Sequence, residues 1–148
     1  ELGKLMKEHN VTYIPTISAV DVSSQYRGWQ KGKAPEPANV TNKKKSFKEA
    51  IASGVSIGMG GDVGVYPHGE NALEMELMVE YGMKPLDVLK SATSVNSRAF
   101  HLENKVGFIR EGLTADLVIV TGNPSNTISD VRKVQFVMKD GTVYRNEK

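Results

Sequence analysis

The hydrophobic pattern of this chain changes its period once, and that change constrains the fold more than any other feature. Up to residue 102, short apolar runs alternate with segments whose apolar residues recur at helical spacing. This alternation is typical of strand–helix units that build a parallel sheet. After residue 102 the pattern becomes that of short strands, and Asp140-Gly141 between two apolar runs is a strong hairpin signal. We therefore predict an α/β protein with two domains, residues 1–102 and residues 103–148.

Residues 55–61 form the most informative strand, because they are apolar and glycine-rich and end directly at a carboxylate, Asp62. Residues 18–39 are polar and contain few apolar side chains to offset the entropy of ordering, so we predict an irregular loop that is the most mobile part of the chain. The remaining predicted elements are a strand over residues 11–17, helices over residues 42–53, 71–81 and 96–102, a helix opened by Pro85, and strands over residues 117–120, 134–139 and 142–144.

Composition excludes several classes of function. The 148 residues carry 19 basic and 17 acidic side chains, a net charge of +2, so no strong field favours nucleic acid or a membrane surface. The absence of cysteine excludes disulfides and thiolate metal sites. No apolar run approaches the roughly 20 residues that span a bilayer. The chain starts at Glu1 within a helical pattern, so we expect an incomplete N-terminus. The sequence leaves the compartment open, with a cytoplasmic protein favoured over a secreted one.

Asp62 is the first candidate for chemistry. A carboxylate that follows a buried parallel strand lies at the carboxyl edge of the sheet, where barrel and doubly wound folds carry their active sites. Asp62 is therefore either a metal ligand or general base, or a carboxylate that caps its own loop. His68 in the same loop either contacts a substrate or helps to begin the next helix. We expect Asp116, before a later strand, to be a turn residue.

The three histidines, His9, His68 and His101, are too far apart in sequence to form a paired metal-binding motif. A complete metal site within this chain is therefore not expected. Nucleophile-elbow, phosphate-loop and dinucleotide-binding patterns are absent as well.

Two ordered segments resemble the amidohydrolase superfamily. Residues 54–62, GVSIGMGGD, resemble its last barrel strand, although Gly61 replaces the usual Thr or Ser before the Asp. Residues 107–119, GFIREGLTADLVI, are similar to the signature with which that superfamily's chain leaves the barrel for a small β-domain. The loop Tyr66-Pro-His-Gly-Glu-Asn71 is similar to the imidazolonepropionase-like branch, which includes metal-dependent Xaa-Pro dipeptidases.

The resemblance implies a fold and an activity. The chain would supply the last strands and helices of a TIM-type (β/α)8 barrel, which takes roughly 250 residues, followed by strands of a small β-sandwich domain. The parent protein would be a metal-dependent hydrolase, zinc being the expected metal, that cleaves an amide or peptide C–N bond in a dipeptide, N-acyl amino acid or cyclic amide. Asp62 would bind metal and act as the catalytic base and acid, while His68 and Tyr66 would contact the substrate.

A second hypothesis belongs to another class of function. The superfamily's other metal ligands are absent from this chain, so the polypeptide alone is expected to be inactive. It would then be a non-catalytic fragment that acts as a structural or oligomerising piece. Unpaired strands at the edge of an open sheet invite pairing with another chain. We therefore expect a homo-oligomer whose only other partner is a small-molecule or dipeptide substrate.

Overall fold

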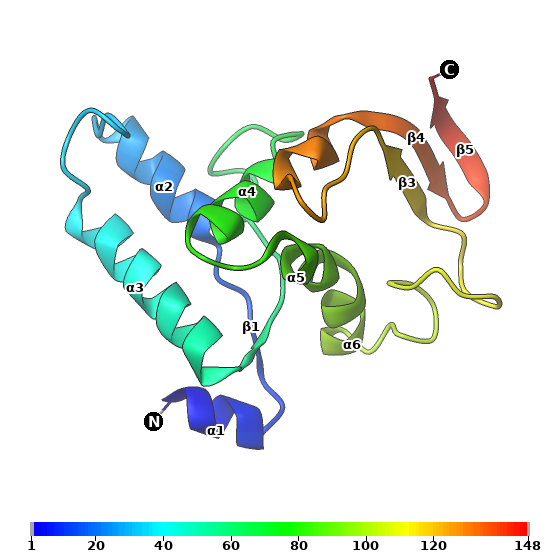
Figure 1. Ribbon diagram of the computed structural model, residues 1–148, viewed down its shortest axis with the longest axis horizontal. Coiled ribbons are helices and arrows are strands. Elements are labelled where there is room, and N and C mark those ends of the chain that lie inside the picture. The colour runs from blue at the N-terminus through cyan, green and yellow to red at the C-terminus, as the bar shows by residue number, and fades with distance from the viewer. Residues whose placement is uncertain (1, 148) are drawn as a thin grey trace. The chain divides into compact units, whose positions relative to one another are not determined.

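The computed structural model describes residues 2–147 and contains two compact units, the first ending at Met83 and the second beginning at Lys84 (Figure 1). Each unit is a group of residues in mutual contact, which does not by itself make it a domain. The predicted domains, residues 1–102 and 103–148, therefore stay a prediction. Helices and strands are mixed, as an α/β sequence pattern requires. Within the described residues, no helix combines the length and the apolar character needed to cross a membrane.

The first unit is built from four helices and two very short strands. Its elements in chain order are α1 (Leu2–Glu8), β1 (Thr12–Tyr13), α2 (Ile17–Tyr26), α3 (Ala38–Ser53), β2 (Ser56–Ile57) and α4 (Ala72–Glu80). β1 and β2 pair in parallel, with Tyr13 opposite Ile57, which confirms the predicted parallel arrangement. The predicted strand over residues 55–61 is shorter than expected, because β2 comprises only Ser56–Ile57, with the Gly58 amide still bonded to the Tyr13 carbonyl at 2.9 Å.

Helices α2 and α3 run side by side in opposite directions (Figure 1), and α4 packs against α2. The side chains at the centre of this unit are almost wholly shielded from solvent. They are Ile17, Val40, Phe47, Leu77, Met78 and Tyr81. Removing such side chains from water is the main favourable contribution to folding of the unit. α3 ends at Gly54, whose φ of 68° is the left-handed conformation expected of a residue that closes a helix.

The predicted loop over residues 18–39 is wrong for its first part, because Ile17–Tyr26 form helix α2. The helix buries polar side chains, and each has at least one hydrogen-bond partner outside the helix. Asp21 accepts hydrogen bonds from Gln25 and Lys31, and the Ser24 hydroxyl accepts one from the Asn39 amide. Tertiary hydrogen bonds thus replace the apolar stripe by which sequence reasoning finds a helix. The predicted mobility of residues 18–39 stays a prediction.

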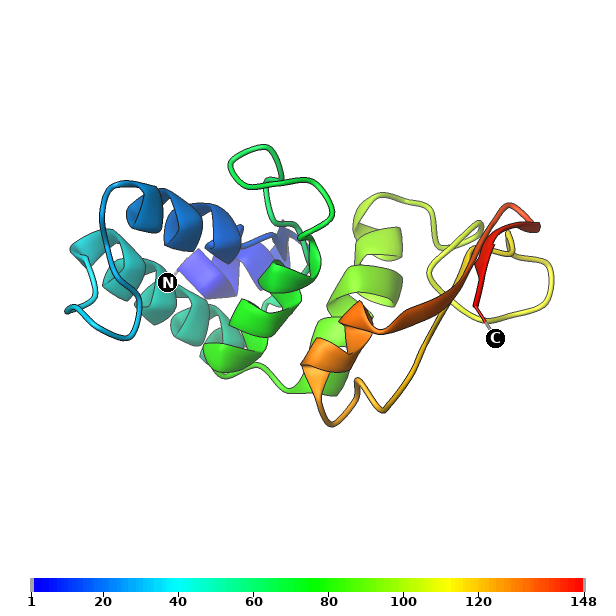
Figure 2. The same ribbon diagram turned by 90° about the horizontal axis from the view of Figure 1, so that it is seen from above.

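The second unit consists of a continuous helical stretch and a small antiparallel sheet (Figure 2). The helical stretch comprises α5 (Pro85–Lys90), the π-helical turn η1 (Ser91–Val95) and α6 (Asn96–Ala99). The sheet has the order β3 (Leu117–Val120), β4 (Val134–Lys139) and β5 (Thr142–Asn146), with the 3-10 turn η2 (Ile128–Arg132) before β4. This confirms the prediction of one antiparallel β unit separate from the parallel pair.

Asp116 holds the hairpin between β4 and β5. Its carboxylate accepts hydrogen bonds from the Asp140 amide, at 2.8 Å, and from the Lys139 ammonium. The Gly141 amide bonds to the carbonyl of Ala115, the neighbour of Asp116. The Lys139 ammonium, and then the Asp140 amide, hold the pKa of Asp116 below its usual value. Asp116 is thus a turn residue, as the sequence indicated.

Replacing Asp116 with Ala should release this turn. We expect the amides of Asp140 and Gly141 to exchange with solvent about fivefold faster, the factor for loss of a hydrogen bond of ordinary net strength. Because the folded-state pKa is lowered, the contribution of Asp116 is present above its ordinary pKa and is lost as pH falls through the lowered one. Hydrogen exchange followed by NMR measures both effects. Glu111→Ala, with an exposed carboxylate in the same segment, is the matched control, and an equal effect there would contradict the prediction.

Candidate active site

The candidate site lies where the chain leaves the carboxyl ends of the parallel strands β1 and β2. The chain after β1 reaches α2 through Thr16, and the chain after β2 forms an irregular loop, residues 58–71, before α4. Thr16 has φ 46°, a left-handed conformation that is costly for a β-branched residue. Such strain persists only where surrounding contacts over-determine the backbone.

Asp62 stands in the loop after β2 with its side chain exposed to solvent. Its φ is 57°, a left-handed conformation that aspartate and asparagine adopt more readily than most residues. Its carboxylate makes no hydrogen bond or ion pair to any residue in 2–147, so it does not cap the loop within the described chain. Its backbone carbonyl accepts a hydrogen bond from the Val65 amide at 3.4 Å.

Ser18, in the first turn of α2, connects three segments. Its hydroxyl oxygen lies 2.7 Å from Glu74 Oε2, 3.0 Å from the Gly61 carbonyl oxygen and 3.0 Å from the Tyr66 hydroxyl. The Ser18 side chain is completely shielded from solvent. A serine hydroxyl has one proton and two lone pairs, so Ser18 shares its proton between Glu74 and Gly61 and accepts the proton of Tyr66.

Glu74 is completely buried and stabilises the start of α2. Its two carboxylate oxygens accept hydrogen bonds from the backbone amides of Ile17, at 2.9 Å, and Ser18, at 2.7 Å. These are donors that the helix itself leaves unpaired, and Thr16 provides no side-chain cap. The Glu74 carboxylate, which comes from α4, therefore replaces an N-cap side chain as the acceptor for the first amides of α2. It also lies at the positive end of the helix dipole.

Burial raises the pKa of Glu74, although the amides and hydroxyl that bond to it act in the opposite direction. For an acid with a raised folded-state pKa, the stabilising contribution is complete below the ordinary pKa and declines as pH rises through the raised value. The hydrogen bonds to Ile17 and Ser18 reduce this loss by favouring the charged form. Water does not reach the Glu74 carboxylate, so the hydrogen bonds from Ile17 and Ser18 have to replace those that water would make.

Tyr66 is 3% exposed, and its hydroxyl lies beside Gly61. A Cβ placed on Gly61 would lie 2.1 Å from the Tyr66 hydroxyl oxygen, far inside contact distance. The glycine at position 61, where the superfamily usually has Thr or Ser, thus leaves the space that the Tyr66 hydroxyl occupies. The predicted contact of Tyr66 with a substrate stays a prediction, since in this structure its hydroxyl bonds to Ser18.

The structure does not bring the histidines together with Asp62 in a metal-binding cluster. His68 is exposed in the same loop as Asp62, whereas His9 follows α1 and His101 lies in the second unit. Within residues 2–147, no three His, Asp or Glu side chains are grouped so that they could hold a metal ion. The carboxylate of Asp62 suits a divalent cation chemically, but within this chain it would be a single ligand.

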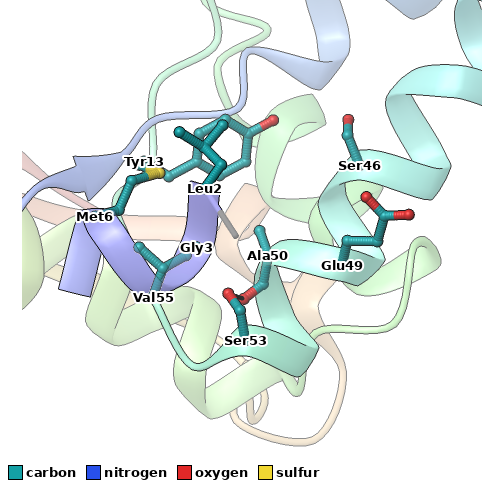
Figure 3. A pocket seen from close by; sticks show the side chains of 9 residues that line it. All are labelled: Leu2, Gly3, Met6, Tyr13, Ser46, Glu49, Ala50, Ser53 and Val55. Atoms are coloured by element: carbon teal, nitrogen blue, oxygen red, sulfur yellow. Dashed lines mark hydrogen bonds between the residues drawn. The ribbon is translucent and has the colours of Figure 1, made fainter. Parts of the chain in front are cut away.

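A cavity of about 400 Å³ lies elsewhere in the first unit, between α1, β1 and α3 (Figure 3). Apolar groups of Leu2, Met6, Tyr13 and Val55 make up much of its wall, together with residues of α3. None of Asp62, Tyr66 and His68 lines it. The cavity is therefore distinct from the candidate site, and Tyr13 belongs to it.

Sequence reasoning missed Ser18 and Glu74. Ser18 was placed in a loop, and nothing in its neighbourhood marks it. Glu74 did leave a signal, because it lies three and four positions before Leu77 and Met78 and so on the same face of α4. A charged residue on the apolar face of a helix is rarely buried without a partner. That signal predicts a buried acceptor, but not which donors it meets.

Comparison with known proteins identifies the family. A sequence model of the amidohydrolase family matches residues 2–144, nearly the whole chain. The chain belongs to this family, which confirms the resemblance seen in residues 54–62 and 107–119. The family supports a hydrolytic function at a general level, and its members use divalent metals. A comparison with curated proteins finds no match.

Solved structures agree with the assignment. The chain is 35% identical to a Xaa-Pro dipeptidase with methionine bound in its active site, with a TM-score of 0.83 over 97% of this chain and 37% of that one. It is 29% identical to the ochratoxinase of A. niger, with a TM-score of 0.79 over 97% of this chain and 34% of that one. It is 25% identical to a prolidase complexed with N-methylphosphonate-L-proline, with a TM-score of 0.76 over 98% and 37%. The chain thus spans little more than a third of the length of these proteins.

The contact between Gly61 and Tyr66 gives a direct test of the loop geometry. Gly61 does not have a positive φ, so alanine is acceptable to the backbone there and its cost comes from the tyrosine hydroxyl. We expect Gly61→Ala to destabilise the protein by about 1–3 kcal/mol, the usual cost of overpacking. Tyr66→Phe in the same chain should recover most of that loss, because it removes the clashing oxygen. Urea unfolding of both single variants and the double variant measures the coupling, and strictly additive effects would contradict this geometry.

Proposed function

We propose that the protein containing this chain is a metal-dependent amidohydrolase that cleaves an amide or peptide C–N bond. The observation that carries the proposal is Asp62, an exposed carboxylate without a partner in residues 2–147 that follows the parallel strand β2. In this proposal residues 1–102 supply the last strands and helices of a (β/α)8 barrel, and residues 103–148 contribute strands to a small β-sandwich domain. Active sites of such barrels lie at the carboxyl ends of the strands, where Asp62 lies.

Asp62 is proposed to have two functions in the reaction. As one ligand it would help to hold a divalent metal, for which zinc is the expected identity, while the other ligands come from outside this chain. When bound, such a metal polarises the scissile carbonyl and lowers the pKa of water. The Asp62 carboxylate would accept the proton of the attacking water and then return a proton to the leaving amine, as general base and then general acid.

The proposed substrate is a dipeptide, with an N-acyl amino acid or a cyclic amide as the other members of the class. Support comes from the similar structures, of which one is a Xaa-Pro dipeptidase with bound methionine and another a prolidase with a phosphonate analogue of a proline derivative. His68 is exposed in the same loop as Asp62 and is proposed to contact the substrate. Tyr66 is proposed as a second contact. Its hydroxyl would then have to give up its hydrogen bond to Ser18 and bond to the substrate instead.

The alternative, that the 148-residue polypeptide is a non-catalytic structural piece, applies to the chain in isolation. A catalytic metal site takes about three protein ligands, and residues 2–147 group no such set. We therefore propose that catalysis requires the longer protein, and that homo-oligomerisation or a complementary chain covers the open edges of β1 and β2. Added zinc that restored amide hydrolysis to this chain alone would reject that proposal.

Asp62→Asn in the full-length protein tests the proposed function. Asparagine adopts the left-handed conformation of Asp62 as readily, so the fold should be unchanged. The substitution removes the proton acceptor, and we expect kcat to fall by about 10²–10⁴-fold, with bound metal reduced as well. Hydrolysis of a dipeptide ending in proline and metal analysis by mass spectrometry give the two readouts.

Glu70→Gln is the matched control, because it makes the same charge change in the same loop. It should retain activity within a few-fold of the parent protein. If Asp62→Asn retained as much activity as Glu70→Gln, the catalytic function of Asp62 would be rejected.

A further inference from the structure

The position of Asp62 depends on a contact that its own side chain does not make. Its carboxylate is exposed and has no partner in residues 2–147, so the backbone on either side has to place it. The carbonyl of Gly61 belongs to the peptide group that leads into Asp62, and its oxygen lies 3.0 Å from the Ser18 hydroxyl. Because a peptide group is planar, holding that oxygen also restricts the orientation of the plane that contains the Asp62 Cα. The direction of the Asp62 side chain depends on this orientation.

The same hydroxyl also holds the far side of the loop. Tyr66 lies four residues after Asp62, and its hydroxyl is 3.0 Å from Ser18 Oγ. Between the two anchored points, the Gly64 amide donates to the Tyr66 carbonyl at 3.1 Å. The loop therefore forms a short closed turn around Asp62, attached at both ends to one atom in the first turn of α2.

Ser18 is itself fixed by Glu74. The carboxylate binds the Ser18 amide and hydroxyl, both at 2.7 Å, and the Ile17 amide at 2.9 Å. All of these atoms are shielded from water, because Glu74 and Ser18 are completely buried. Buried charge-assisted hydrogen bonds of this kind are short and strong, and they hold their donors rigidly.

We propose that Ser18 and Glu74 are positioning residues of the hydrolase, which hold Asp62 in its reactive position by anchoring the Gly61 carbonyl and the Tyr66 hydroxyl. This inference rests on the proposed function of Asp62. Neither residue touches the substrate, and each acts through the loop. A catalytic group displaced by about 1 Å can lose about 10²-fold in rate, so a buried anchor of this kind controls kcat.

Ser18→Ala separates this function from the capping of α2. Alanine keeps the backbone amides of Ile17 and Ser18 bonded to Glu74. It removes the hydroxyl that reaches Gly61 and Tyr66, and with it one of the three hydrogen bonds to Glu74. Ser24→Ala is the matched control. It makes the same chemical change in a buried position of the same helix, but the Ser24 hydroxyl bonds to Val20 and Asn39 and not to the loop.

Two measurements on the full-length protein decide the proposal. Hydrogen exchange by mass spectrometry reports the protection of the loop, residues 62–66, and steady-state kinetics with a dipeptide report kcat and KM. For Ser18→Ala we expect loop exchange to rise about fivefold or more. We expect kcat to fall about 10- to 100-fold, with KM changed by less than about threefold. Ser24→Ala should change neither quantity, even if both variants lower the melting temperature.

Glu74→Gln extends the test to the buried carboxylate. Its amide nitrogen would face a backbone donor, so one hydrogen bond to Ile17 or Ser18 is lost. We expect kcat to fall at least as far as in Ser18→Ala, because Ser18 then loses its own support.

Equal changes in Ser18→Ala and Ser24→Ala would overturn the proposal, as would unchanged kcat in Ser18→Ala even with faster exchange of the loop. Failure of the proposed function is distinguishable from this result. It would show as full activity of Asp62→Asn, whereas the exchange comparison of the two serine variants does not depend on the reaction.

Discussion

The first unit depends on one interaction, the burial of the Glu74 carboxylate against the start of α2. Burying a charge is costly unless donors replace the lost water, and here two backbone amides and the Ser18 hydroxyl do so. The interaction fixes α4 to α2 at the point where the chain leaves β1. Because Thr16 is held there in a left-handed conformation, the helix has no cap of its own, and Glu74 completes the helix start.

The geometry of the loop that carries Asp62 depends on this interaction. Ser18 joins Gly61 and Tyr66, and the absence of a side chain on Gly61 leaves the space that the tyrosine hydroxyl fills. Glycine before the aspartate, tyrosine four residues after it, and serine in α2 are thus parts of one packing arrangement. A substitution at one of these positions is expected to require changes at the others.

The second unit shows the same principle in a more exposed setting. Gly122 lies where a Cβ would meet the Asp130 carboxylate at 2.3 Å, and Asp130 accepts a hydrogen bond from the Asn123 amide at 2.8 Å. Asp116 likewise connects the start of β3 to the turn between β4 and β5. The Ala-Asp of the family signature is therefore structural in this chain, because it bonds the turn of the hairpin to the start of β3.

The sequence by itself determined the α/β character, the antiparallel hairpin at Asp140-Gly141, the family, and Asp62 as the first candidate for chemistry. These follow from local periodicity, turn chemistry and ordered motifs, which need no knowledge of distant contacts. Only the tertiary structure decided that Ile17–Tyr26 form a helix, that Glu74 caps it, and that Tyr66 points inward to Ser18. The bonds of Glu74 and Tyr66 to the start of α2 join residues 48 to 57 positions apart, and Lys31 and Asn39 bond to the same helix from outside it. A single sequence does not show which buried donors and acceptors meet.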